Sequence, residues 1–192
     1  LNDGSADHAR VDNLKCITYG GAPMYLADLK KSLAVFGAKL YQIYGQGEAP
    51  MTITGLSKRE HAQALEVGDN ELLLSAGYAR TGVEVRVVDE HDRNLPIGET
   101  GEIITRSDCV MSGYWENAAA NAATLRGGWL HTGDMGSLDS RGLLTIRDRS
   151  KDLIISGGSN IYPREIEDVL LLNNKVAQAS VIGIPHAEWG EE

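Results

Sequence analysis

Apolar residues recur every three or four positions between Tyr25 and Phe36, which predicts an amphipathic helix. Gly37 follows directly, and glycine in this position commonly ends a helix. Short apolar runs at 14–19 and 39–44 flank the helix and predict strands. A strand, a helix and a strand in this order predict a parallel α/β unit, which binds ligands at the carboxyl ends of its strands.

Beyond about Gly68 the pattern changes from helical spacing to alternation of apolar and polar residues. Residues 83–87 read V-E-V-R-V, and 102–106 and 142–146 are further strand candidates. An alanine-rich stretch at about 116–125 predicts a helix between them. Short strands joined by turns predict a small, mostly antiparallel, barrel-like β subdomain.

The last part of the chain returns to an α/β pattern. We predict an apolar strand at 153–155, a helix from Pro163 to Leu172 and a strand at 179–184. Proline suits the first turn of a helix, which supports a helix start at Pro163. The charged segment 147–152 lies between two apolar strands, where a hinge between domains would fall.

The predicted fold class is therefore α/β, with α+β character in parts, and the chain divides into three regions. Residues 1–67 form the end of a parallel α/β subdomain, and 68–148 form the β subdomain. Residues 149–192 form a hinge and the start of another α/β domain. Because three elements do not complete such a domain, we expect the chain to be a fragment of a longer protein.

Composition narrows the classes of function. The 192 residues are 42% hydrophobic and 23% charged, with a formal net charge of −9. An acidic chain argues against a nucleic-acid surface, because phosphate backbones need clustered Lys and Arg. No apolar run approaches the roughly 18 residues of a membrane helix, so we expect no span and a cytoplasmic location. Cys16 and Cys109 lack metal-ligand spacing and are expected to be reduced, buried thiols, with a disulfide or a reactive thiol as alternatives.

Glycine-containing loops carry the candidate chemistry. G-G-A-P (20–23) and Y-G-Q-G-E (44–48) follow the two strands of the parallel unit, where a ligand can lie against bare backbone. Asp134 lies in T-G-D-M-G, whose glycines let the backbone bend closely around a ligand. Each loop also has a structural interpretation. Residues 20–23 could be only a strand-to-helix turn, and 44–48 a core tyrosine beside a solvated Glu48. Asp134 could be a carboxylate that caps its own turn.

These stretches carry a resemblance to a known family. T-G-D, then D-R-S-K-D (148–152), then G-G-S-N-I-Y-P-R-E-I-E (157–167) resemble the adenylate-forming acyl-CoA synthetase (AMP-binding) family. The G-G-A-P and Y-G-Q-G-E loops fall in the order and rough spacing of that family. The resemblance covers nearly the whole chain, and implies the end of a large N-terminal domain followed by the start of a C-terminal lid.

The resemblance implies roles for individual residues. Tyr44 would pack on adenine, Glu48 would hold Mg²⁺, and Asp134 would accept the ribose hydroxyls. Lys151 would be the hinge about which the lid rotates, although charged runs such as this are commonly solvated. The implied ATP or AMP contacts are Gly20, Gly21, Ala22, Pro23, Gln42, Tyr44, Gly45, Gln46, Gly47, Asp134 and Arg149, and the implied CoA-tunnel residues are Gly157 and Gly158.

Two features depart from the family pattern. Gly47 stands where the family has a threonine that contacts phosphate, so a backbone N–H or a water would replace that hydroxyl. No glycine- and Ser/Thr-rich phosphate loop occurs in the 192 residues, and we expect the fragment itself to be inactive. His131 and Trp129 are expected to pack rather than to catalyse, because no nucleophile pattern accompanies them.

The function implied for the longer protein is that of an ATP- and Mg²⁺-dependent acid–CoA ligase, a setting that includes fatty acid metabolism. It would activate a small carboxylic acid as acyl-adenylate, release pyrophosphate, and transfer the acyl group to CoA. The alternatives are an amino-acid- or aryl-acid-adenylating domain that serves a carrier protein, and a non-catalytic nucleotide-binding fragment. The acid remains open among aromatic, medium-chain and long-chain types, and a homodimer is a further expectation.

Overall fold

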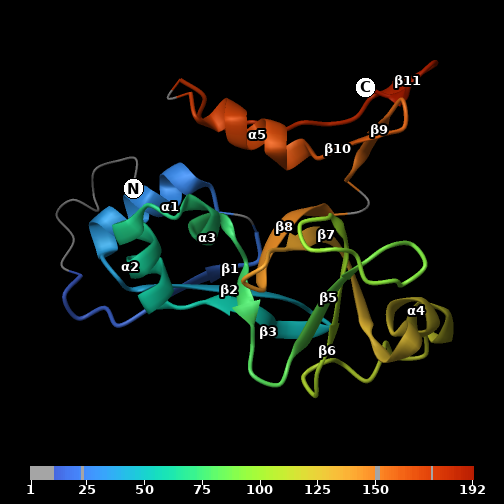
Figure 1. Ribbon diagram of the computed structural model, residues 1–192, viewed down its shortest axis with the longest axis horizontal. Coiled ribbons are helices and arrows are strands. Elements are labelled where there is room, and N and C mark those ends of the chain that lie inside the picture. Colours follow the sequence, from blue (N-terminus) through green and yellow to red (C-terminus); the bar gives the residue numbers. More distant parts are fainter. Residues whose placement is uncertain (1–10, 23, 150–151, 174) are drawn as a thin grey trace.

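The computed structural model describes residues 11–22, 24–149, 152–173 and 175–192 (Figure 1). A large sheet with three helices at one end is followed by a smaller C-terminal part that contains one helix and one small sheet. In chain order the elements are β1 (Ile17–Gly20), α1 (Leu26–Phe36), β2 (Leu40–Gln46), β3 (Ala49–Leu56), α2 (Lys58–Val67), α3 (Asn70–Leu74), β4 (Gly77–Ala79), β5 (Glu84–Val88), β6 (Gly101–Arg106), α4 (Ala118–Thr124), the 3₁₀ helix η2 (Arg126–Gly128), β7 (Leu130–Leu138), β8 (Leu143–Arg149), β9 (Ile154–Ser156), β10 (Ser159–Ile161), α5 (Pro163–Leu171), β11 (Pro185–His186) and β12 (Gly190–Glu191).

The large sheet has eight strands in the order β1-β2-β3-β4-β8-β7-β6-β5. Strands β1 and β2 are parallel, and every other neighbouring pair is antiparallel. The parallel unit and the mostly antiparallel region that follows it were both predicted, and the α/β fold class is confirmed. One continuous sheet contains both regions, so the subdomain boundary near residue 67 stays a prediction.

Helix ends follow local chemistry. Helix α1 ends at Gly37, whose φ of 68° suits glycine, and α5 begins with Pro163. Helix α2 begins with a capping box. The Ser57 side chain accepts the backbone N–H of Glu60, and the Glu60 carboxylate accepts the backbone N–H of Ser57. The helices α1, α2 and α3 gather at the β1–β2 end of the sheet (Figure 1).

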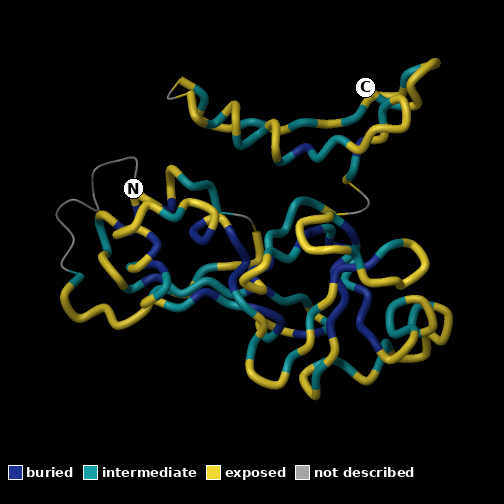
Figure 2. The backbone as a smooth tube through the Cα atoms, viewed as in Figure 1, coloured by how far each residue is buried: buried dark blue, intermediate teal, exposed yellow. Residues whose placement is uncertain are grey.

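The buried residues concentrate in and around the large sheet (Figure 2). One apolar cluster lies between the helices and the β1–β2 end, and a second lies under the antiparallel strands. Burial of these side chains stabilises the fold by roughly 25 cal/mol for each Å² of apolar surface removed from water. The fully buried large side chains include Leu29, Leu40, Ile53, Leu56, Ile103, Leu130, Leu143 and Leu144.

The C-terminal part differs from its prediction in two places. The predicted strand at 179–184 is wrong, because the structure assigns no strand there and pairs β11 with β12 instead. Val181 donates its backbone N–H to the Glu167 carboxylate of α5 at 2.9 Å rather than to a neighbouring strand. The charged segment is also not wholly a linker, since β8 continues to Arg149.

Two further expectations concern the surface. Cys16 and Cys109 are free thiols, but both are exposed, so the prediction that they are buried is wrong. Among the residues that the structure describes, no helix is long and apolar enough to cross a membrane.

Candidate functional site

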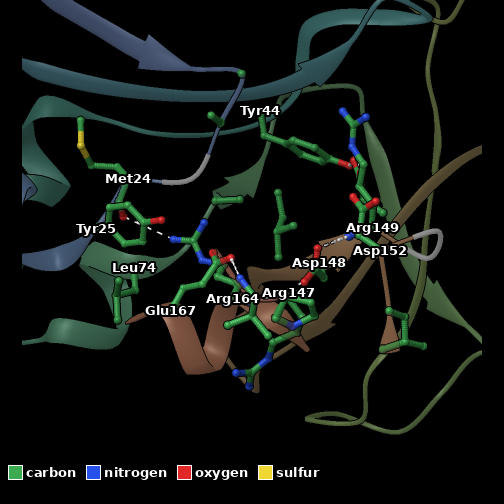
Figure 3. A pocket seen from close by; sticks show the side chains of 18 of the residues that line it. Met24, Tyr25, Tyr44, Leu74, Arg147, Asp148, Arg149, Asp152, Arg164 and Glu167 are labelled. Atoms are coloured by element: carbon green, nitrogen blue, oxygen red, sulfur yellow. Dashed lines mark hydrogen bonds and ion pairs between the residues drawn. The ribbon is translucent and has the colours of Figure 1, made fainter. Parts of the chain in front are cut away.

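A cavity of about 900 Å³ lies where the carboxyl end of β2 meets β7, β8 and the C-terminal helix α5 (Figure 3). The candidate residues come from five separate stretches of the sequence, and the fold brings most of them to this cavity. The predicted residues that line it are Gly21, Ala22, Gln42, Tyr44, Gly45, Gln46, Asp134 and Arg149.

Asp134 reaches the cavity because strand β7 bulges. On β6, Glu102 and Ile104 pair with Met135 and His131, so three residues of β7 lie opposite one residue of β6. Residues 132–134 lie opposite Ile103, two more than regular pairing needs, and their bend uses a φ of 69° at Gly133. A bulge beside a cavity re-aims a side chain that regular pairing would place elsewhere. The T-G-D sequence is thus the local reason that the carboxylate faces the site.

The Asp134 carboxylate is buried, and its two oxygens have different surroundings. Oδ2 accepts the Tyr44 hydroxyl at 2.7 Å and the Gln46 side-chain amide at 2.8 Å. Oδ1 lies 3.6 Å from Nε of Arg149, whose side chain is 58% exposed. A carboxylate can accept about four hydrogen bonds. Asp134 therefore keeps acceptor capacity on the side that faces the cavity and the guanidinium.

Tyr44 is both a core residue and a cavity residue. Its side chain packs in the second apolar cluster, while its hydroxyl reaches Asp134 and the residue points toward Arg149 in Figure 3. Burial, and then the Asp134 carboxylate, raise the pKa of Tyr44 above its ordinary value of 10.0. The tyrosine consequently stays protonated and remains a donor to Asp134. Its packing on a base stays a prediction.

Gln42 precedes Tyr44 by two residues on β2, so the two side chains lie on the same face of the strand. The Gln42 amide nitrogen donates to the Ile43 carbonyl at 3.2 Å. Its carbonyl oxygen is buried and has no hydrogen-bond partner among the described residues. A buried acceptor that lines a cavity without a partner can accept a hydrogen bond from a ligand.

Two glycines permit close backbone contacts beside the cavity. A Cβ at Gly20 would lie 2.3 Å from the carbonyl oxygen of Ile43, and one at Gly45 would lie 2.3 Å from the backbone nitrogen of Met51. At both positions a larger residue would separate neighbouring strands. At Gly47 a Cβ would meet nothing within 4 Å, so the missing threonine is not explained by lack of space.

Glu48 lies in a second hollow of about 290 Å³, beyond Gln46 and Thr132. One carboxylate oxygen, Oε1, accepts the Tyr114 hydroxyl, and this bond, followed by burial, raises the pKa of Tyr114. The structure assigns no partner to the second oxygen within its described residues. Among those residues no group of three or more His, Cys, Asp or Glu could hold a metal ion. A lone carboxylate fits Mg²⁺ that is held mainly by phosphates and water.

Glu102 supports the Thr132–Asp134 bulge from the same hollow. Its Oε1 accepts the backbone N–H of Gly133 at 3.1 Å, and its Oε2 accepts Nδ1–H of His131 at 2.8 Å. Arg126 approaches Oε2 at 3.4 Å. The His131 side chain is only 4% exposed, which agrees with the prediction that it packs. Glu102 thus ties the bend before Asp134 to strand β6.

The remaining predicted residues lie away from the large cavity or are not among the residues that the structure describes. Gly157 and Gly158 form the turn between β9 and β10, with φ values of 56° and 82°. Pro23 and Lys151 lie outside the described residues, so their roles stay predictions. The roles assigned to the other site residues likewise stay predictions, although their placement is now known.

Sequence reasoning missed Glu102, Tyr114 and Arg164. Arg164 lies in the first turn of α5, lines the large cavity and packs over the Tyr25 ring at 5.7 Å. No local pattern marks any of the three, because each acts through a contact with a distant part of the chain. The bulge at Asp134 was also missed, although a glycine within a strand pattern is a known signal for one.

The site thus combines the buried Asp134 carboxylate with Tyr44 and Arg149, around a cavity at the carboxyl end of a parallel strand pair. This arrangement is that of a ligand-binding α/β protein. The family model of the AMP-binding enzyme matches residues 1–115, and the chain belongs to that family.

Among curated relatives, a medium/long-chain-fatty-acid–CoA ligase of Mycobacterium tuberculosis is 38% identical over 100% of this chain and 32% of its own length. A fatty acid–[acyl-carrier-protein] ligase of Streptomyces coeruleorubidus is 41% identical over 93% of this chain and 33% of its own. Among solved structures, an amide bond synthetase of Marinactinospora thermotolerans is 37% identical with a TM-score of 0.88, over 97% of this chain and 37% of its own. The chain thus spans about a third of these relatives.

Proposed function

We propose that the chain is the nucleoside-binding part of an acid-activating ligase that uses ATP and CoA. Membership of the AMP-binding enzyme family supports acid adenylation as the reaction class. The observation that carries the proposal for this chain is the Asp134 carboxylate, which is buried, held on one oxygen by Tyr44, and open toward the large cavity on the other.

The chemistry of the site suits an adenosine ligand. Sugar hydroxyls are donors, and Asp134 offers an acceptor beside the Arg149 guanidinium. The buried Gln42 oxygen would accept a hydrogen bond from the amino group of adenine. Tyr44, which follows Gln42 on β2 and donates its hydroxyl to Asp134 of β7, would contribute the apolar face on which the base lies. The three residues thus give a donor-rich nucleoside two acceptors and one packing surface.

The proposed reaction has two steps. A carboxylate oxygen of the acid attacks the α-phosphorus of ATP, the bond to the β-phosphate oxygen breaks, and pyrophosphate leaves with its electron pair. The CoA thiol, after loss of its proton, then attacks the acyl carbon of the acyl-adenylate, and AMP leaves. In both steps the residues of this chain hold the adenosine moiety, which fixes the reacting atoms relative to their attacking groups.

Magnesium would bind at Glu48, where it would neutralise phosphate charge. Lys151 is proposed as the hinge of the lid, and Gly157 and Gly158 as the border of the channel for the pantetheine arm of CoA. Because no phosphate loop occurs in the sequence, we propose that the 192-residue chain binds the nucleotide without completing the reaction. The acid is not assigned.

The names of two relatives suggest two alternatives to CoA as the acyl acceptor. One relative is named a fatty acid–[acyl-carrier-protein] ligase and one an amide bond synthetase, so a carrier-protein thiol or an amine could replace CoA in the second step. CoA is favoured here because the curated relatives include CoA ligases of several acids.

Calorimetric titration tests the proposal. The wild-type chain and Asp134→Ala are titrated with AMP and with ATP–Mg²⁺. Weak AMP binding that is lost in Asp134→Ala is the expected result. No heat with either nucleotide would contradict the proposal, and would favour the alternative of a structural fragment.

A further inference from the structure

Tyr114 is separated from Glu48 by 66 residues, yet its hydroxyl donates to the Glu48 carboxylate. It lies in the loop between β6 and α4, whereas Glu48 lies in the turn between β2 and β3. The two turns meet at the second hollow, which both residues line. Glu48 is therefore attached to a neighbouring loop.

The backbone of Glu48 is held by the same loop. Its carbonyl oxygen accepts the backbone N–H of Met111 at 2.8 Å. The loop thus binds both the main chain and the side chain of Glu48. The backbone contact holds the main chain of Glu48, and the Tyr114 contact limits the rotation of its three side-chain bonds.

The position of Tyr114 is itself fixed by helix α4. Asn121 accepts the backbone N–H of Tyr114 through Oδ1 at 2.6 Å, and donates through Nδ2 to the Tyr114 carbonyl at 3.0 Å. One side-chain amide therefore satisfies both backbone groups of the tyrosine. Gly113 precedes it with a φ of 142°, and a Cβ there would lie 3.0 Å from the Asn121 amide atoms. The backbone of the tyrosine is consequently held by two hydrogen bonds to α4.

The hydrogen bond leaves Glu48 with one free oxygen. Oε1 is bonded to Tyr114, and the structure assigns Oε2 no partner among the described residues. The other acid in the hollow, Glu102, is already bonded to His131 and Gly133. A single oriented carboxylate oxygen beside a hollow is what one protein ligand to a phosphate-bound Mg²⁺ requires.

We propose that Tyr114 is a positioning residue for Glu48: it occupies one carboxylate oxygen and aims the other at the magnesium ion of the bound nucleotide. Asn121 contributes indirectly, because its hydrogen bonds to the Tyr114 backbone fix the loop that carries the tyrosine. This inference rests on the proposed function, because it takes Glu48 as the magnesium ligand. Neither Tyr114 nor Asn121 needs to touch the nucleotide, and partners that orient metal ligands commonly tune metal affinity.

The test compares AMP, which needs no magnesium, with ATP–Mg²⁺, by calorimetric titration of the 192-residue chain. Tyr114→Phe removes only the hydroxyl. Because the lost bond involves a charged acceptor, we expect the affinity for ATP–Mg²⁺ to fall about fivefold, with AMP unchanged. Tyr78→Phe is the matched control, since no described residue is assigned a hydrogen bond to its hydroxyl and its ring packs on the core.

Further variants separate positioning from structure. Glu48→Gln should weaken ATP–Mg²⁺ binding, and Tyr114→Phe should add little in the Glu48→Gln background, because both changes act through one group. Asn121→Ala should have the same selective effect as Tyr114→Phe. Thermal unfolding of every variant shows whether the fold is retained.

Several results would overturn the inference. One is equal ATP–Mg²⁺ affinity in Tyr114→Phe and wild type, and another is an equal loss for AMP, which would indicate a general effect on the pocket. A third is wild-type ATP–Mg²⁺ affinity in Glu48→Gln, since Tyr114 would then have no metal ligand to position. Failure of the proposed function gives a different result, namely that the wild-type chain binds neither nucleotide.

Discussion

Removal of the Glu102 carboxylate should destabilise the chain and weaken nucleotide binding together. In Glu102→Ala, the backbone N–H of Gly133 and Nδ1–H of His131 lose their acceptor; the His131 side chain is buried, and Gly133 is half-buried. An orphaned donor of this kind costs about 1–3 kcal/mol. The contact with Arg126 adds little, because that side chain is 40% exposed.

Summed over the two donors, we expect Glu102→Ala to lower the free energy of unfolding by about 3 kcal/mol. Glu102→Gln should cost about 1 kcal/mol, because its amide oxygen can still accept from Gly133. Glu84 offers a matched control on the adjacent strand β5. It pairs with Arg106 at 2.7 Å, but its side chain is 52% exposed, so Glu84→Ala should cost about 0.5 kcal/mol.

Urea unfolding at neutral pH measures the three free energies, and AMP titration of the folded variants measures the second effect. Because Gly133 precedes Asp134, a loosened bulge should also weaken AMP binding in Glu102→Ala but not in Glu84→Ala. The reasoning is refuted if Glu102→Ala costs no more than Glu84→Ala, or if it loses stability with unchanged AMP affinity.

Three other predictions follow from packing and charge. Gly45→Ala should cost more than about 2 kcal/mol, because a Cβ would meet the Met51 backbone nitrogen at 2.3 Å, whereas Gly47→Ala should change stability by less than about 0.5 kcal/mol in urea unfolding. Gly47→Thr should strengthen ATP–Mg²⁺ binding without changing AMP binding in calorimetric titration, since it adds the hydroxyl that the family resemblance implies for a phosphate contact. Burial lowers the pKa of His61 below 6.5, so the unfolded chain binds a proton more readily than the folded chain. The free energy of unfolding should therefore fall as the pH drops below about 6.5. An NMR titration midpoint of His61 at or above 6.5 would refute this.

The elements that could be predicted are those whose signals are local. Helix α1 follows from its apolar spacing and from Gly37, and α5 from Pro163, so both begin and end within one or two residues of their predicted bounds. The parallel pairing of β1 and β2 follows from the helix between them. Strand β3 escaped prediction because Pro50 and Gly55 interrupt any alternation.

Other parts of the fold depend on distant contacts. Residues 179–184 have the composition of a strand, but, among the described residues, only Ile184 at their end exchanges backbone hydrogen bonds with another segment, at Glu192. Val181 donates its backbone N–H to the Glu167 carboxylate instead. The site shows the same division. The sequence indicated Asp134, Tyr44 and Glu48, and a glycine within a strand was a local signal for the bulge that aims Asp134. The contact of Tyr114 with Glu48 joins two loops 66 residues apart, so no local pattern shows it.

The central claim is that Asp134 holds the ribose hydroxyls of an adenine nucleotide. The most direct measurement is titration of the wild-type chain and of Asp134→Asn with AMP and with 2′,3′-dideoxyadenosine monophosphate, which lacks both hydroxyls. The claim predicts that the wild type binds AMP at least about tenfold more tightly than the dideoxy nucleotide, and that Asp134→Asn loses most of this preference. Equal affinity of the wild type for both nucleotides would contradict the claim.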